Sequence, residues 1–177
     1  MLKPWITPPP SVYDSHYAWL TSTGSLTARI VARSNNFRVE RRFQGTRPPA
    51  IDEAALIGLC GKQFAHVREV VLLADEVPVV FAHSVVTLKD LSGIWRSVGK
   101  LGNRPLAAAL FANPLVKRFP LQYRLINRHH YLHARVRAAG LNPPTRLWAR
   151  RSLFHLHERP ILVTEVFLPE ILRLNEK

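Results

Sequence analysis

Residues 161–169 form an apolar run near the C-terminus in which hydrophobic side chains fall on both alternating faces. This pattern predicts a β-strand that is covered on both sides. Glu165 stands in the middle of the run, where an unpaired ionised carboxylate would be costly. We therefore expect Glu165 to be buried and to be hydrogen-bonded, paired with a cation, or protonated. Each outcome suits an active site, and an arginine ion pair that only supports the fold is the alternative.

Two pairs of β-rich segments are each separated by a short turn. The first pair is residues 64–74 and 79–87, joined by the turn residues 75–78. The second pair is residues 147–156 and 161–168, joined by residues 157–160. Pro78 fits the first hairpin, because proline is tolerated where a strand begins. A further strand is expected over residues 37–43.

Short helices are expected over residues 52–59, 91–98, 105–111 and, as a piece bounded by prolines, 115–123. Ser25 is a suitable N-cap for another short helix that begins at Leu26. Strands separated by turns rather than by regular helices favour an antiparallel sheet. The sequence therefore predicts an α+β fold, an antiparallel β-sheet with helices packed on one face.

The chain has 177 residues, 47% of them hydrophobic, which is enough to bury one core. We expect a single domain over residues 1–177, with residues 1–12 as an extended, proline-rich segment. The lone cysteine, Cys60, cannot form an intramolecular disulfide, which favours a reducing compartment, and we expect it to be buried. No signal-peptide core or window of membrane-span length is present, so the expected protein is soluble and cytoplasmic. We also expect it to be a monomer.

Basic side chains outnumber acidic ones by 25 to 12, which gives a formal net charge of +13 and a surface that attracts anions. Nucleic acid is one candidate partner. However, no aromatic residues stud the arginine clusters at stacking intervals, and no helix-turn-helix pattern is evident. A solvated basic face, or steering of a small anionic substrate, explains the charge more simply. Peripheral association with acidic partners or membrane lipids is a further hypothesis.

Three places in the chain suit the binding of a small anion. Arg68 shares a strand face with Val70 and Leu72, so its guanidinium needs a carboxylate partner, either that of a ligand or that of Glu165. Pro105 suits the first position of a helix and would leave backbone N–H groups free around Leu106. The helix start at Leu26 offers a second such group. An ordinary helix cap is the alternative at both starts.

Metal and covalent chemistry are disfavoured by the sequence. His129, His130 and His133 lie among arginines that would repel a cation, and no carboxylate or cysteine completes a ligand set. Neither a nucleophile elbow nor a phosphate-binding glycine loop is present. We expect neither a metal nor a cofactor. Glu69, on the face opposite Arg68, is expected to be a surface or salt-bridge residue.

Four motifs resemble the chorismate lyase family, whose members make 4-hydroxybenzoate at the head of ubiquinone synthesis. They are REVVLLAD at residues 68–75, LGNRPL at 101–106, LWARRS at 147–152 and LVTEVFLP at 162–169. The last two, in that order, are the most specific. The resemblance spans residues 24–169 and implies an antiparallel sheet with helices, a closed ligand cavity, and conversion of chorismate to 4-hydroxybenzoate and pyruvate without a metal or cofactor.

The resemblance also implies roles for four residues. Arg68, with the backbone N–H groups of Leu106 and Leu26, would hold the ring carboxylate of chorismate, and Glu165 would meet the ring hydroxyl. Glu165 and Arg68 are the expected catalytic residues. His83 stands where some relatives have an arginine, and it is either a core histidine bonded to a backbone carbonyl or a contact for the second carboxylate of the substrate.

Two readings of mechanism and two of function stay open. Hydrogen transfer from C4 of chorismate to the enolpyruvyl methylene could be cyclic, or Glu165 could act in proton transfer. Effector-binding domains of some bacterial transcription regulators resemble the same fold and bind ligands without turning them over. Such domains normally follow a helix-turn-helix module, and the residues before the matching region are too few to form one. The sequence therefore favours the enzyme.

Overall fold

The computed structural model describes residues 4–7 and 9–175. Residues 1–3 and 8 of the expected extended N-terminal segment lie outside the described residues. Within the described part of that segment, Ile6 forms an antiparallel bridge with Tyr123. This bridge places Ile6 beside the sheet.

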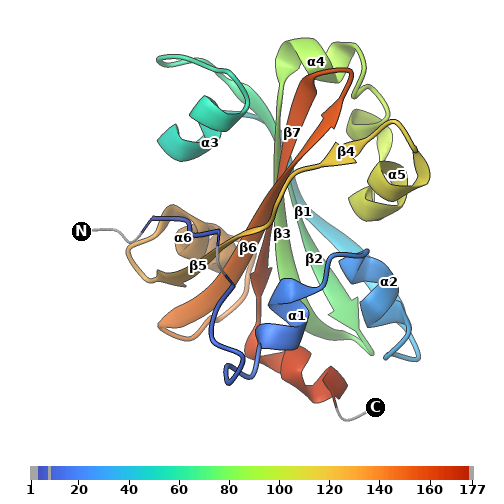
Figure 1. The fold of residues 1–177 in the computed structure, drawn as a ribbon, viewed down its shortest axis with the longest axis vertical. Coiled ribbons are helices and arrows are strands. Elements are labelled where there is room, and N and C mark those ends of the chain that lie inside the picture. The colour runs from blue at the N-terminus through green and yellow to red at the C-terminus, as the bar shows by residue number, and fades with distance from the viewer. Residues whose placement is uncertain (1–3, 8, 176–177) are drawn as a thin grey trace.

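A seven-stranded antiparallel sheet forms the centre of the molecule (Figure 1). Its strands are β1 (Phe37–Arg47), β2 (Ala65–Ala74), β3 (Val77–Thr87), β4 (Lys117–Arg118), β5 (Gln122–Asn127), β6 (Arg146–Leu156) and β7 (Arg159–Phe167). The strand order is β1-β2-β3-β7-β6-β4, and β5 also pairs with β6. The two hairpins β2–β3 and β6–β7 therefore meet where β3 pairs with β7.

Both predicted hairpins are confirmed, with tighter turns than expected. Each turn consists of two residues with positive φ, Asp75 and Glu76 in the first and His157 and Glu158 in the second. Such turns match the right-handed twist of paired strands. β3 and β7 consequently begin at Val77 and Arg159, two residues earlier than predicted.

The helices are short and lie around the sheet. They are α1 (Tyr17–Thr21), α2 (Leu26–Val31), α3 (Ile51–Leu56), α4 (Leu88–Ser92), α5 (Leu106–Ala112) and α6 (Tyr131–Ala138), with 3₁₀ helices η1 (Val98–Lys100) and η2 (Pro169–Asn175). Ser25 caps α2 as predicted, because its Oγ accepts a hydrogen bond from the N–H of Ala28 at 3.2 Å.

Two helix predictions were wrong. The segment 91–98 is not one helix, because α4 ends at Ser92 and Gly93 leaves helical geometry before η1 begins. The segment 115–123 contains β4 and the start of β5 instead of a helix. Its backbone pairs with β6, and Pro120, which lacks an N–H, would interrupt a helix there. Strand β5 and helix α6 were not predicted.

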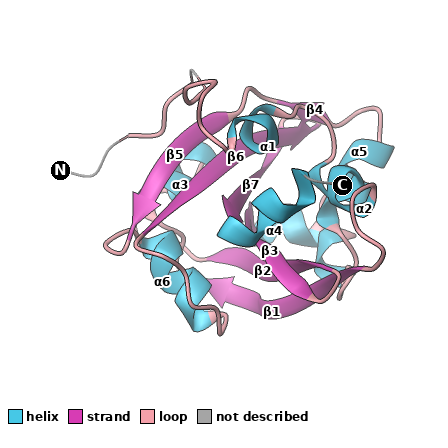
Figure 2. Ribbon diagram, turned by 90° about the horizontal axis from the view of Figure 1, so that it is seen from below, coloured by secondary structure: helices cyan, strands magenta, loops and turns pink. Residues whose placement is uncertain are grey.

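The helices cover both faces of the sheet, whereas the sequence predicted one covered face. Residues of α1 and α2 pack with β2 and β7 in one apolar cluster, and residues of α5 and η1 pack with β3, β6 and β7 in another on the same face. Residues of α6 and α3 pack in two clusters on the opposite face. Figure 2 shows the curved sheet between these groups. The predicted α+β class with a large antiparallel sheet is confirmed.

Three further observations complete the fold. Cys60 is exposed, so the expectation of a buried cysteine was wrong; it lies in the loop between α3 and β2 and outside the apolar clusters. Within residues 4–7 and 9–175, no helix is both long and apolar enough to cross a membrane. In the same residues, no group of three or more histidine, cysteine, aspartate or glutamate side chains could hold a metal ion.

Candidate active site

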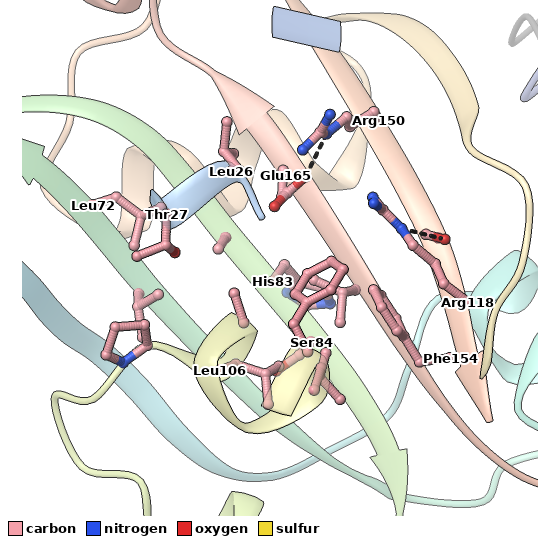
Figure 3. Close-up of a pocket in the computed structure, with 18 of the residues that line it drawn as sticks. Leu26, Thr27, Leu72, His83, Ser84, Leu106, Arg118, Arg150, Phe154 and Glu165 are labelled. Atoms are coloured by element: carbon pink, nitrogen blue, oxygen red, sulfur yellow. Dashed lines mark hydrogen bonds and ion pairs between the residues drawn. The ribbon is translucent and has the colours of Figure 1, made fainter. Parts of the chain in front are cut away.

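A pocket lies between the sheet and helices α2 and α5, in the gap between the two apolar clusters of that face (Figure 3). Alternate residues of β2, β3, β7 and β6 form its floor, because successive strand residues point to opposite faces. The lining includes four charged side chains that face it: Arg68, Arg118, Arg150 and Glu165. Most of the other lining residues are apolar. The pocket therefore combines a mostly apolar wall with a few fixed charges, as small-molecule sites do.

The register of the strands sets the order of the polar groups across the floor. Arg68 on β2 is opposite Ser84 on β3. Glu165 on β7 is opposite Ala82 on one side and Arg150 on the other. Arg68 and Glu165 therefore lie on the same face, two strands and two residues apart, which separates their Cα atoms by about 12 Å at the usual strand and residue spacings.

Glu165 is paired with an arginine and borders the pocket at the same time. Its side chain is 17% exposed, so it is less buried than predicted. Oε2 accepts a hydrogen bond from Nε of Arg150 at 2.5 Å. Oε1 has no hydrogen-bond partner among the described residues and is free to accept one from a ligand.

Arg150 is buried and holds several parts of the fold together. Its Nη1 donates to the carbonyl oxygens of Trp19, Leu20 and Ser22 at 3.0, 3.1 and 2.7 Å. These carbonyls belong to the end of α1, where helical acceptors lack intrahelical donors. Nη2 is buried without a partner among the described residues. Arg150 thereby fixes one orientation of the Glu165 carboxylate.

Arg68 has no carboxylate partner within the described part of the chain. Its Nη2 donates to the carbonyl oxygens of Gly102 and Arg104 at 3.0 and 2.8 Å, and its Nε is buried and unpartnered. Burial, with a smaller contribution from Arg41, lowers the pKa of Arg68 to about 10, so it remains a cation at neutral pH. The alternative that Arg68 pairs with Glu165 was wrong, because Arg150 takes that place.

Leu26 and Leu106 are the first residues of α2 and α5, and both line the pocket. Their backbone N–H groups make no hydrogen bond to the described residues, as expected at a helix start. Pro105 precedes the helix as its N-cap residue and does not occupy the first helical position. The structure thus brings Leu26, Arg68, Leu106 and Glu165 to one cavity.

His83 borders the pocket, but its imidazole belongs to a buried ionic cluster on the opposite face of the sheet. Nδ1 lies 3.2 Å from Oε1 of Glu69, and Nε2 lies 3.0 Å from Oε1 of Glu53. Burial alone would lower the pKa of His83, but the two carboxylates outweigh it and raise the pKa to about 9. Both ring nitrogens are therefore engaged by carboxylates, and the ring is not available to a ligand carboxylate. Neither interpretation of His83 from the sequence, a backbone-bonded core histidine or a substrate contact, included these carboxylate partners.

Glu69 joins the same cluster as a buried salt-bridge residue. Its two oxygens accept hydrogen bonds from Nε and Nη2 of Arg135, both at 2.7 Å. Burial would raise the pKa of Glu69, but hydrogen bonds from Arg135 and His83 outweigh it and lower the pKa to about 2. The salt bridge was predicted, and its burial was not.

Sequence reasoning gave no role in the site to two of the four charged residues. Arg118, on the edge strand β4, donates from Nε to Oγ of Ser152 at 3.2 Å. It fell inside the segment predicted as a helix, so its direction could not be inferred. The sequence contained an indication that Arg150 has a buried partner. Adjacent arginines in a strand covered on both sides must point to opposite faces, and each needs a partner there. Arg151, on the other face, pairs with Asp52.

A helix-covered antiparallel sheet with three arginines and one carboxylate in a partly enclosed pocket defines a binding site for a small organic anion. The family model described as chorismate lyase matches residues 6–176. This chain belongs to the chorismate lyase family, which confirms the resemblance of its motifs.

Two curated relatives illustrate the match. A protein of Nitrosomonas europaea described as "Probable chorismate pyruvate-lyase" is 50% identical over 161 residues, which cover 91% of this chain and 90% of the relative. A protein of Nitrosospira multiformis with the same description is 47% identical over 174 residues, which cover 98% and 97%. The similarity therefore extends over nearly the whole length of these relatives.

Solved structures support the fold alone. The effector domain of PhnF from Mycobacterium smegmatis has a TM-score of 0.57 at 12% identity, with 84% of this chain and 91% of that chain covered. The ligand-binding domain of a putative GntR-family transcriptional regulator from Bordetella bronchiseptica has a TM-score of 0.54 at 12% identity, with 77% and 87% covered. At this level of identity the likeness carries no information about ligands.

Proposed function

We propose that this protein is a chorismate pyruvate-lyase that converts chorismate to 4-hydroxybenzoate and pyruvate. The observation that carries the proposal is the placement of Arg68 and Glu165 two strands apart in one pocket of a chorismate lyase family member. A cation at one end suits the ring carboxylate. A hydrogen-bond acceptor beyond it suits the hydroxyl group on the opposite side of the ring.

The site residues share three tasks in this proposal. Arg68 and the backbone N–H groups of Leu26 and Leu106 bind the ring carboxylate. Oε1 of Glu165 accepts a hydrogen bond from the C4 hydroxyl, while Arg150 keeps the carboxylate in place. The apolar lining excludes water and strengthens these contacts.

The reaction itself needs orientation more than it needs reactive groups. The bond between C3 and the ether oxygen breaks, C4 loses its hydrogen, and the cyclohexadiene becomes aromatic. The departing enolpyruvyl group gains one hydrogen at its methylene carbon and becomes pyruvate. The driving force is already present in the substrate, so a pocket that holds the side group over C4 supplies most of what is needed.

The first experiment mixes purified protein, treated with a chelator, with chorismate and follows both products. Equal formation of pyruvate and 4-hydroxybenzoate is expected. Binding of chorismate without turnover would instead indicate a ligand-sensing domain, and the absence of both would overturn the proposal. The Arg68→Ala variant is the control, because a contaminating lyase activity would be unaffected by it.

The fate of the C4 hydrogen separates the two mechanisms. With deuterium at C4, a cyclic transfer delivers the label to the methyl group of pyruvate, which mass spectrometry detects. Loss of the label to solvent would exclude the cyclic transfer and support proton transfer through an exchangeable group such as the Glu165 carboxylate. The Glu165→Gln variant gives a second criterion, since near-normal turnover would contradict a proton-transfer role for this residue.

The proposal also covers the pathway, the cellular location and the oligomeric state of the enzyme. We expect the product to enter ubiquinone synthesis and the protein to act as a cytoplasmic monomer. Size-exclusion chromatography with light scattering tests the oligomeric state. A stable dimer would contradict that part without affecting the activity.

A further inference from the structure

The proposed site leaves one group of the substrate without a partner. Chorismate carries a carboxylate at C1, the enolpyruvyl ether at C3 and a hydroxyl at C4. Arg68 and Glu165 account for the groups at C1 and C4. The carboxylate of the enolpyruvyl group is a second negative charge, and burying it without a cation would be costly. His83 cannot serve, because both of its ring nitrogens are engaged by Glu53 and Glu69.

The substitution pattern of the ring limits where this carboxylate can lie. C3 is adjacent to C4, so the side group leaves the ring next to the group that Glu165 contacts. Continuing across the sheet from Arg68, the strands beyond Glu165 are β6 and then β4. These strands carry the two remaining pocket arginines, Arg150 and Arg118.

Arg150 is less accessible to a ligand than Arg118. Nε is bonded to Glu165, Nη1 is shared among three backbone carbonyls, and Nη2 is unpartnered among the described residues but buried. Its side chain is 1% exposed, so a ligand can hardly reach it. It is better described as the residue that holds Glu165.

The guanidinium of Arg118 is fixed by hydrogen bonds and still has N–H donors available for a ligand. Nε donates to Ser152, and Nη1 donates to the carbonyl oxygen of Thr23. Nη2 has no hydrogen-bond partner among the described residues. Figure 3 shows the guanidinium turned toward the side of the pocket where Glu165 and Arg150 lie. A positioned guanidinium with a free donor edge is suited to a carboxylate.

Two aromatic rings flank this guanidinium. Its central carbon lies 5.6 Å from the ring centroid of Phe111 and 5.4 Å from that of Phe154. Such contacts stabilise a cation and limit its rotation. Burial, and then repulsion from Arg150, lower the pKa of Arg118, so an anion bound there would relieve both penalties.

The charges of the pocket match the substrate better than the product. Three arginines and one glutamate face the cavity and leave two positive charges unbalanced. Chorismate is a dianion, whereas 4-hydroxybenzoate is a monoanion. Two separated cations therefore fit the two carboxylates of chorismate, and one cation is left without an anion when 4-hydroxybenzoate alone is bound.

We propose that Arg118 binds the carboxylate of the enolpyruvyl group and thereby selects dicarboxylate ligands for this pocket. The inference rests on the proposed lyase function for the identity of the natural ligand. Arg118 would also hold the enolpyruvyl chain in one orientation relative to C4. It is a determinant of substrate specificity beyond the four residues implied by the family resemblance.

A pair of stable ligands tests the proposal without turnover. 4-Hydroxy-3-(carboxymethoxy)benzoate carries the second carboxylate on an ether at C3, and 4-hydroxybenzoate lacks it. Calorimetry gives the affinity of each for the wild type and for Arg118→Met. We expect the variant to bind the dicarboxylate about tenfold or more weakly, since a desolvated charge-assisted contact is lost. Binding of 4-hydroxybenzoate should change by less than about twofold.

Two further variants serve as controls. Arg118→Lys keeps the charge without the fork and should retain part of the affinity for the dicarboxylate. Arg137→Met removes an exposed arginine from α6, on the opposite face, and should leave both affinities unchanged. Thermal unfolding verifies that each variant is folded, and Arg118→Lys carries the test if Arg118→Met is not.

The outcomes separate this inference from the proposed function. Equal losses for both ligands, or no loss for either, would overturn the role of Arg118 whether or not the wild type is a lyase. A wild type that does not convert chorismate, together with a selective loss in the variant, would overturn the lyase and support the dicarboxylate site. With an active wild type, Arg118→Met should raise the KM for chorismate by a similar factor.

Discussion

Arg150 and Glu165 lie directly opposite each other on β6 and β7, with Nε and Oε2 2.5 Å apart. The same guanidinium also binds three carbonyl oxygens at the end of α1. One buried side chain therefore positions the carboxylate of the site and attaches a helix to the sheet. Glu165 can face a ligand because its charge is already balanced within the fold.

The two members of this pair should differ in their importance for stability. Arg150→Met leaves Glu165 and three carbonyls without their donor, and we expect a loss of about 3–5 kcal/mol in the free energy of unfolding. Glu165→Gln keeps a hydrogen-bond acceptor next to Arg150, and we expect a loss of only about 1 kcal/mol. Urea unfolding measures both values. Similar losses for the two variants would show that the α1 carbonyls contribute little.

Arg68 should act mainly in binding. Arg68→Ala removes the cation expected to meet the ring carboxylate, which chorismate and 4-hydroxybenzoate share. We expect both the KM for chorismate and the dissociation constant of 4-hydroxybenzoate to rise by about tenfold or more. Steady-state kinetics and calorimetry provide the two values. An unchanged KM would count against the assigned role.

Gly102 should influence the site through the backbone. Its carbonyl accepts a hydrogen bond from Arg68, and its φ is +57°, a region that favours glycine. An added Cβ would meet no atom within 4 Å, so Gly102→Ala introduces only backbone strain, about 1 kcal/mol. We expect relaxation of this loop to displace Arg68 and to raise KM more than it lowers kcat.

Gly58 provides the matched control for that substitution. Its φ is +73°, and an added Cβ there also meets no atom within 4 Å. It follows α3, which packs on the face opposite the pocket. Gly58→Ala should cost a similar amount of stability and leave KM unchanged. An equal change of KM in both variants would point to a general loss of folding instead of a local effect on Arg68.

The buried cluster of His83 and its carboxylates should make stability dependent on pH. The pKa of His83 is raised from 6.5 to about 9, so the folded state binds its proton more tightly than the unfolded state. The contribution is complete below about pH 6.5 and is lost as the pH rises to about 9. Its size is on the order of 3 kcal/mol. Thermal unfolding across this range measures the decline.

The variant His83→Gln tests whether this histidine causes the decline. It should be less stable than the wild type at pH 6 and should show a flatter profile between about pH 6.5 and 9. A parallel decline in His83→Gln at alkaline pH would exclude His83 as the source.

Glu69 makes stability depend on pH in the acid range, because its pKa is lowered from 4.5 to about 2. Its contribution to stability is present above about pH 4.5 and is lost as the pH falls toward 2.

The two hairpins were predictable because their signals are local. Apolar residues on both faces and a short turn specify each pair of strands without reference to the remaining chain. The segment 115–123 was mispredicted because its conformation depends on pairing with β6, which local propensity does not contain. Strand β5 contains one arginine, and helix α6 contains two arginines and one histidine. The burial of such side chains depends on partners in other elements, so the local pattern predicted neither element.

The site was predictable to a similar extent. Arg68 and Glu165 stand out as charges in apolar strands, and the family motifs added Leu26 and Leu106. The pairing of Glu165 with Arg150 instead of Arg68 follows from the strand order, since β7 has β6 as its neighbour and β2 lies two strands away. Burial of His83 between two carboxylates required α3 to bring Glu53 onto the far face of the sheet. Neither relationship is visible in the sequence alone.

The joining of β3 to β7 has a consequence for how the protein assembles. Val86 pairs with Ile161 and Val80 with Phe167, so this seam connects hairpins that are distant in the sequence. Each hairpin can form from residues that are close in the sequence. The pairing of β3 with β7 carries the additional entropy cost of ordering the long intervening chain. Arg68 lies on one side of the seam and Glu165 on the other. A ligand that contacts both residues therefore holds the two hairpins together. During refolding, the recovery of ligand binding shows when the two hairpins have paired.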